Sequence, residues 1–234
     1  MKIILNFLFR QMSCRAGKCV FFFGSFLILI SPVTRADEDV YRYPLGTQTM
    51  AAFLAVSERL AEHPVTKGTF EQEKILSRLG RSLKSEGNFI IAAARGMVWE
   101  TLKPFPSTLV LGKEYMIQSR PGGQKTVISA EGNETFLRLA EVLSAVFTGN
   151  ARGLLDNFEI FFRVMDSGRT WELGLSPLDR AIGSFAARIT MSGDEVIRFI
   201  MINELNGDIT RYTMANHNHP AELSANEKAL FTIP

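Results

Sequence analysis

The sequence predicts a single, mainly β domain in which two amphipathic helices pack inside the concave face of a strongly curved antiparallel sheet. About ten short apolar or alternating segments follow one another with turn residues between them, which is typical of an antiparallel meander or barrel. Two further segments have apolar residues at helical spacing instead. The chain of 234 residues has a length that suits one domain with a sizeable core.

Residues 1–36 are expected to be a cleavable signal peptide. Basic residues precede an apolar run at 19–30, and the small residues Thr34 and Ala36 then provide a cleavage site. The run is shorter than the ~20 residues that a membrane span needs, so a permanent anchor is the weaker interpretation. We therefore expect an exported, soluble domain that covers residues 37–234.

The expected signal peptide, called the leader below, also changes how the composition of the chain is interpreted. It contains both cysteines, Cys14 and Cys19, so the domain is expected to have no disulfide and no thiol nucleophile. The chain has 26 basic and 24 acidic residues, and the leader contains five of the basic ones and none of the acidic ones. The domain itself is therefore net acidic. We expect no nucleic-acid partner, because binding to phosphates needs a basic surface.

Two segments have the apolar spacing of an amphipathic helix. The first covers residues 49–62 and ends at Pro64, because the residue before a proline disfavours the α region. The second begins after Asn133, which can cap it, and ends before Gly149. Its apolar stripe consists of Phe136, Leu139, Ala140, Leu143, Val146 and Phe147.

Short strands are expected on both sides of the second helix. Turn sequences such as Pro-Gly-Gly at 121–123 and Asn-Gly-Asp at 206–208 separate them. The expected strands are residues 68–77, 83–94, 96–101, 107–111, 115–119, 158–164, 170–176, 185–191, 196–203 and 208–215, with a last one at 228–233.

The sequence contains no nucleophile elbow, phosphate-binding loop or zinc-protease motif. Of its three histidines, His63 is expected at the surface, and His217 and His219 are expected in a polar hairpin loop, where they would supply too few ligands for zinc. We therefore expect no enzyme activity, no metal and no cofactor. Three acidic residues are candidates for acid–base catalysis, but we interpret them as solvated surface charges. They are Glu71, Glu73 and Glu86.

One part of the chain resembles a known family. Residues 86–107 contain Gly87, an apolar strand, then Arg95 and Trp99, and this order resembles the second and third strands of the periplasmic carriers of outer-membrane lipoproteins, the LolA-like family. The Phe-Xaa-Gln motif at 70–72 and the later strand and hairpin segments up to residue 210 are also similar. The similarity covers nearly all of residues 50–215 and depends on order and spacing.

The resemblance implies an incomplete, half-open antiparallel β-barrel closed by a helical lid. It also implies a carrier that accepts acylated lipoproteins from an inner-membrane donor protein and delivers them to an outer-membrane acceptor protein. Each methylene group exposed to water costs ~0.8 kcal/mol, so such cargo must be buried in transit. The family's Arg-Pro pair is replaced here by Ala93 and Ala94, and Arg95 is the predicted latch between sheet and lid.

We therefore predict a monomeric periplasmic carrier with an apolar groove. Alternatives are a carrier of another acylated molecule, such as a glycolipid or pigment ester, a periplasmic binding or structural subunit with a packed core, and a hydrolase with an unrecognised site. The predicted lipid-binding residues are Phe89, Ile91, Met97, Trp99, Leu109 and Leu111 from the sheet, and Phe136, Leu139, Leu143 and Phe147 from the lid helix.

Overall fold

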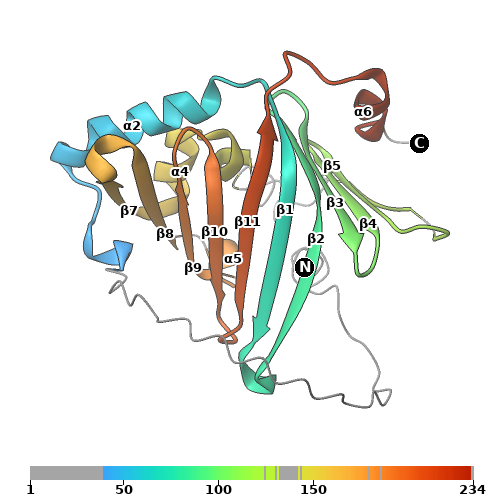
Figure 1. Ribbon diagram of the computed structural model, residues 1–234, viewed down its shortest axis with the longest axis horizontal. Helices are drawn as coiled ribbons and strands as arrows, with labels where there is room; N and C mark the ends of the chain where they lie inside the picture. The colour runs from blue at the N-terminus through green and yellow to red at the C-terminus, as the bar shows by residue number, and fades with distance from the viewer. Residues whose placement is uncertain are drawn as a thin grey trace, which may run out of the picture.

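The computed structural model describes residues 39–123, 125–129, 131, 142, 144–178, 180–184 and 186–232. The expected signal peptide lies outside this part of the chain. Within it, one large antiparallel sheet curves around several short helices (Figure 1). The prediction of a mainly β domain with a meandering antiparallel sheet is confirmed.

The eleven described strands form this single sheet, in the order β6-β5-β4-β3-β2-β1-β11-β10-β9-β8-β7. The last strand pairs with the first, so two meanders join along the β1–β11 contact. Among the described residues, β6 and β7 form the two edges of the sheet and do not pair, so the barrel is incomplete, as predicted. The strands are β1 (Val65–Leu76), β2 (Arg81–Ala92), β3 (Gly96–Lys103), β4 (Ser107–Gly112), β5 (Tyr115–Ser119), β6 (Thr126–Ser129), β7 (Phe158–Met165), β8 (Thr170–Pro177), β9 (Ala186–Gly193), β10 (Ile197–Glu204) and β11 (Ile209–Asn218).

The first amphipathic helix, α2 (Thr47–Ala61), is two residues longer at its start than the sequence predicts and ends before Pro64, as expected. Its first turn is fixed by the Gly46 amide, which donates to Oγ1 of Thr49 at 3.1 Å. In Figure 1 this helix crosses the strands of the β7–β11 half near one end of the sheet. Phe53 and Val56 are buried against the sheet, so the helix has one apolar face, as its sequence period requires.

The end of the second predicted helix is described at residues 144–148, and the chain leaves it through Gly149. Gly149 has φ of +66°, and a Cβ at this position would lie 2.7 Å from both Cβ of Leu60 and the carbonyl oxygen of Ser57. Glycine therefore allows both the left-handed helix end and the close approach to α2. A short helix that the sequence did not predict, α4 (Ala151–Asn157), follows directly, with Asn150 as its cap.

The remaining short helices lie at turns. They are the 3-10 helices η1 (Val40–Arg42), η2 (Ser77–Leu79) and η3 (Asp166–Gly168), and the helices α5 (Arg180–Gly183) and α6 (Ala225–Leu230). The predicted strand at 228–233 is wrong, because Ser224 and Glu227 form a capping box that starts α6 there. Leu223 and Phe231 beside this helix are buried on the outer face of the sheet, against Val98 and Val110.

The main hydrophobic core lies on the concave face of the sheet. It combines side chains from β1 to β5, from β7 to β11 and from the helices α2, 144–148 and α4. The outer face of β2 to β5 has a second, smaller core beneath α6. The sheet is thus apolar on both faces in its β2–β5 region, and the concave face is covered by helices rather than by another sheet.

Candidate functional site

The six sheet residues predicted to bind lipid lie together on the concave face. The strand register places Phe89, Trp99 and Leu109 in one row across β2, β3 and β4. A second row contains Ile91, Met97 and Leu111. All six side chains are buried, with exposed fractions between 1% and 8%, and belong to the main core. Residues two apart on a strand point to the same side of the sheet, so each strand contributes both of its members to this face.

Trp99 is the centre of an aromatic cluster on this face. Its ring lies 4.2 Å from that of Phe70 in a stacked arrangement, and 5.3 Å from that of Tyr212 at an angle of 87°. The rings of Phe89 and Phe147 lie 6.1 and 6.2 Å from it. These are the offset and edge-on geometries that aromatic pairs favour. The cluster joins β1, β2, β3, β11 and the helical segment 144–148 into one apolar surface.

Phe147 is the predicted lid residue that the structure places on this surface. Its side chain is half-buried and packs against the main core. The three other predicted lid residues, Phe136, Leu139 and Leu143, lie outside the described residues. Phe53 and Leu60 of α2 also contact the core, although the sequence analysis gave this helix no part in binding. The helical spacing of apolar residues in α2 was the sequence pattern that could have indicated their part in the site.

A small cavity of about 20 Å³ lies where the helices meet the sheet. Its volume is close to that of a single water site. The cavity lies beside Phe89 and Ile91 of the predicted site, and Phe147 closes it from the helical side. The other residues that line it are Leu60, His63, Thr66, Glu195, Val196, Ile197, Met214, His217 and His219.

All three histidines of the chain meet at this cavity, which the sequence did not predict. The rings of His63 and His219 stack with centroids 3.8 Å apart, and Nδ1 of His219 lies 3.2 Å from Oγ1 of Thr66. Burial, followed by the positive charge of Arg198, lowers the pKa of His217. Burial and the neighbouring His63 lower the pKa of His219. The C-terminal end of β11 therefore approaches the end of α2 through the stacked rings of His63 and His219.

Arg95 lies exposed in the turn between β2 and β3, where its amide donates to the carbonyl oxygen of Ala92 at 2.9 Å. Within the described ranges, no hydrogen bond or ion pair involves its side chain. The assignment of Arg95 as a latch between sheet and lid stays a prediction.

The concave face becomes polar at its other end. The Lys74 ammonium group lies 2.7 Å from Oε1 of Glu204, and these side chains are only 10% and 12% exposed. Thr210 donates to the same carboxylate oxygen at 3.1 Å. Burial and the Glu204 carboxylate raise the pKa of the Tyr212 hydroxyl. The apolar surface is thus bounded by a buried ion pair at one end and by the histidines at the other.

A larger groove of about 430 Å³ lies on the opposite face of the sheet. It contains the three acidic residues considered for acid–base catalysis. Glu86 lies 2.7 Å from Nζ of Lys103, and Glu73 lies 4.0 Å from Arg211, so two of the three carboxylates pair with cations. Other residues that line the groove are Glu71, Gln72, Lys84, Ser85, Pro104, Phe199 and Thr213. This pairing agrees with the interpretation of these carboxylates as surface charges.

In the described part of the chain, no group of three or more His, Cys, Asp or Glu side chains is placed to hold a metal ion. None of its helices has both the length and the apolar character needed to cross a membrane.

No protein-family model matches this sequence, and no curated protein matches it. Several solved structures are similar to it, all at low identity and with TM-scores below 0.5. A DUF1329 family protein from Desulfovibrio piger is 12% identical, with a TM-score of 0.44, and the match covers 79% of this chain and 97% of that one. In the complex of MucA and MucB from Pseudomonas aeruginosa, a chain is 11% identical with a TM-score of 0.46, and the match covers 80% of this chain but 62% of that one.

A third similar structure is a LolA superfamily protein from Nitrosomonas europaea. It is 8% identical with a TM-score of 0.45, and the match covers 78% of this chain and 97% of that one.

Proposed function

We propose that this protein is a periplasmic carrier that binds the acyl chains of lipoproteins, or of a related acylated lipid, and moves them toward an outer membrane. The observation that supports this most directly is the continuous apolar surface around Trp99, which is covered on one side by the half-buried Phe147 rather than by a second sheet. A helix that packs on a sheet through side chains can move away more easily than a strand that is hydrogen-bonded into the sheet. Such a cover fits a protein that must both bind and release apolar cargo.

In this proposal the acyl chains lie along the two rows of sheet residues, between β2–β4 and the helices. Met97 and Met116 belong to the same core, and flexible methionine side chains adapt to ligands of different shape. Both polar ends of the concave face would keep the acyl chains within the apolar part. The inner-membrane donor and the outer-membrane acceptor would be separate proteins, and the carrier would act as a soluble monomer without enzyme activity or cofactor.

Titration with a fluorescent fatty acid tests this function. A carrier is expected to bind the probe with saturation, and an acylated peptide should compete with it. Absence of saturable uptake at probe concentrations below its micelle-forming range would contradict the proposal.

The close packing of the concave face supports a second candidate, a periplasmic binding or structural subunit with a packed core. The six predicted sheet residues are all at most 8% exposed. A domain of this kind would bind partners through its surface and would take up no apolar probe. The same titration separates the two candidates.

A further inference from the structure

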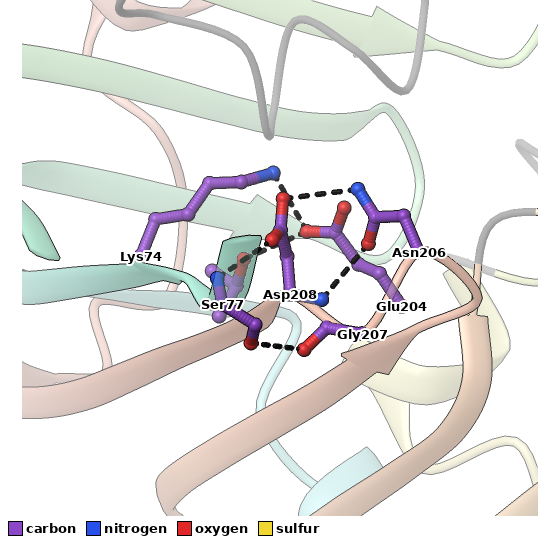
Figure 2. Close-up of polar contacts among 7 residues, drawn as sticks. Lys74, Ser77, Glu204, Asn206, Gly207 and Asp208 are labelled. Carbon is purple, nitrogen blue, oxygen red and sulfur yellow. Dashed lines mark hydrogen bonds and ion pairs between the residues drawn. The ribbon is translucent and has the colours of Figure 1, made fainter. Parts of the chain in front are cut away.

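Two turns that are far apart in the sequence form one compact tip at an end of the sheet. One is η2, between β1 and β2, and the other joins β10 to β11 (Figure 1). The Ser77 amide donates to Oδ1 of Asp208 at 3.0 Å, and the Ser77 hydroxyl donates to the carbonyl oxygen of Gly207 (Figure 2). The two turns are thus tied to each other.

The polar groups of this tip point inward and are hydrogen-bonded. Asn206 donates from Nδ2 to Oδ2 of Asp208 at 2.9 Å, and the Asp208 amide donates back to Oδ1 of Asn206 at 2.9 Å (Figure 2). Lys74 and Glu204 form their ion pair beside these residues (Figure 2). The carboxylates of Asp208 and Glu204 are therefore occupied within the tip, which holds the two turns in a fixed shape.

Each turn presents a leucine to solvent. Leu79 is 67% exposed and Leu205 is 64% exposed, although turns are ordinarily built from Gly, Pro, Asn, Asp and Ser. In the described ranges, no large apolar side chain is more exposed than Leu79. Single exposed leucines need no explanation, but two on neighbouring turns of one rigid tip form an apolar contact point.

The charge around the leucines is positive. Arg78 and Arg81 flank Leu79 and are exposed, and within the described chain neither forms an ion pair. The Glu204 carboxylate is paired with Lys74, and the Asp208 carboxylate is buried. Exposed leucines beside exposed arginines are the combination that favours the interface of an anionic bilayer, where apolar side chains enter between the headgroups and cations remain at their level.

We infer that this tip, consisting of Arg78, Leu79, Arg81 and Leu205, docks the protein on the surface of an anionic membrane. A bilayer fits better than a protein partner because a stable protein interface buries about 800 Å² on each side, which two leucines on short turns do not supply. The contact is shallow and reversible. It does not depend on the proposed carriage of acyl chains, because the tip lies on the two turns and includes none of the predicted lipid-binding residues.

Vesicle flotation of the exported protein, with its N-terminus defined by mass spectrometry, tests the inference. The probes are vesicles of phosphatidylcholine alone and vesicles that also contain phosphatidylglycerol. The wild type is expected to bind the anionic vesicles more strongly, and less so as salt is raised. The double variant Leu79→Gln/Leu205→Gln is expected to lower the partition coefficient roughly tenfold. The double variant Arg78→Gln/Arg81→Gln should remove the preference for anionic vesicles.

Matched controls come from the same chain. Leu230→Gln changes a leucine that is 41% exposed on α6, and Arg120→Gln/Arg152→Gln removes two exposed arginines outside the tip. These controls should bind vesicles as the wild type does, and near-ultraviolet circular dichroism verifies that every variant is folded. The inference is overturned if the wild type does not bind anionic vesicles, or if the two leucine substitutions at the tip leave binding unchanged.

Discussion

The indole ring of Trp99 stacks on the phenyl ring of Phe70 with centroids 4.2 Å apart, although β2 lies between the strands that carry them. The residue of β2 that pairs with Phe70 is Gly87. Because glycine has no side chain, the two rings can meet across this strand. The continuous aromatic surface of the concave face therefore depends on a residue that contributes no apolar atoms beyond its backbone.

Replacing this glycine should destabilise the sheet. A Cβ at Gly87 would lie 1.9 Å from the carbonyl oxygen of Glu100, so Gly87→Ala would force β2 and β3 apart. We expect a loss of about 2 kcal/mol in the free energy of unfolding, measured by urea denaturation. The control is Gly183→Ala in α5, where an added Cβ meets nothing within 4 Å. Equal stability losses in the two variants would contradict this account.

A charge on the covering helix should reduce the binding of acyl chains. Phe147 lies 6.2 Å from Trp99 between the rings and is half-buried. In Phe147→Asp, a carboxylate would face the apolar surface, and we expect affinity for a fluorescent fatty acid to fall at least tenfold. Phe105→Asp, at a phenylalanine that is 49% exposed in the β3–β4 turn, is the matched control and should bind normally. If both variants bind like the wild type, the ligand does not contact this helix face.

Strand geometry explains why the predicted sheet residues lie together. Phe89 and Ile91 are two residues apart on one strand, as are Met97 and Trp99, so each pair lies on one side of the sheet. The sequence did not distinguish the two faces, because Val98 and Val110 on the outer face are apolar and buried as well. It could not predict that Tyr212 would join the concave face, since that depends on β11 pairing with β1 across the whole length of the chain.

The failure at α6 has a different cause. The apolar residues near the C-terminus suggested a strand, but the local capping box of Ser224 and Glu227 favours a helix. Glu227 also accepts from Nζ of Lys67 at 2.6 and 2.7 Å. The stabilising partner of this helix is thus more than 150 residues away in the sequence, where no local pattern reports it.

Breaking the buried ion pair should cost more free energy of unfolding than breaking an exposed one. Lys74→Met would leave the Glu204 carboxylate, which is 12% exposed, without its cation. We expect a loss of roughly 3 kcal/mol in the free energy of unfolding. Adding Glu204→Gln should restore part of this loss. Lys103→Met, which breaks the exposed pair with Glu86, is the control and should change stability little. A double-mutant cycle measured by urea denaturation gives the coupling free energy between Lys74 and Glu204. If the effects of the two substitutions simply add, the ion pair does not contribute as proposed.

His217 and His219 should make the free energy of unfolding depend on pH. The pKa values of His217 and His219 are lowered in the folded protein, so the unfolded state binds more protons as the pH falls through 6.5. The free energy of unfolding should therefore be highest above this pH and should decrease as the pH falls below it. Titratable and charged groups that face the pair are Arg198, Asp194, Glu195 and His63.

The variant His217→Asn/His219→Gln should have a flatter dependence between pH 7.5 and 5.5, measured by urea midpoints. The lowered pKa values of Glu227, at about 2, and of Asp194 act mainly at lower pH, because carboxylates in the unfolded chain titrate at ~4. A slope identical to that of the wild type would show that the histidines do not produce it.

Native mass spectrometry of the protein, purified from a bacterial periplasm without detergent, tests the central claim most directly. A carrier is expected to retain additional bound mass. Collisional activation in the mass spectrometer should release this mass as lipid or acylated peptide. The carrier should also take up an added acylated ligand after this mass has been removed. A clean mass for the unliganded protein, together with no uptake of added acyl ligand, would contradict the carrier function and favour the packed binding subunit.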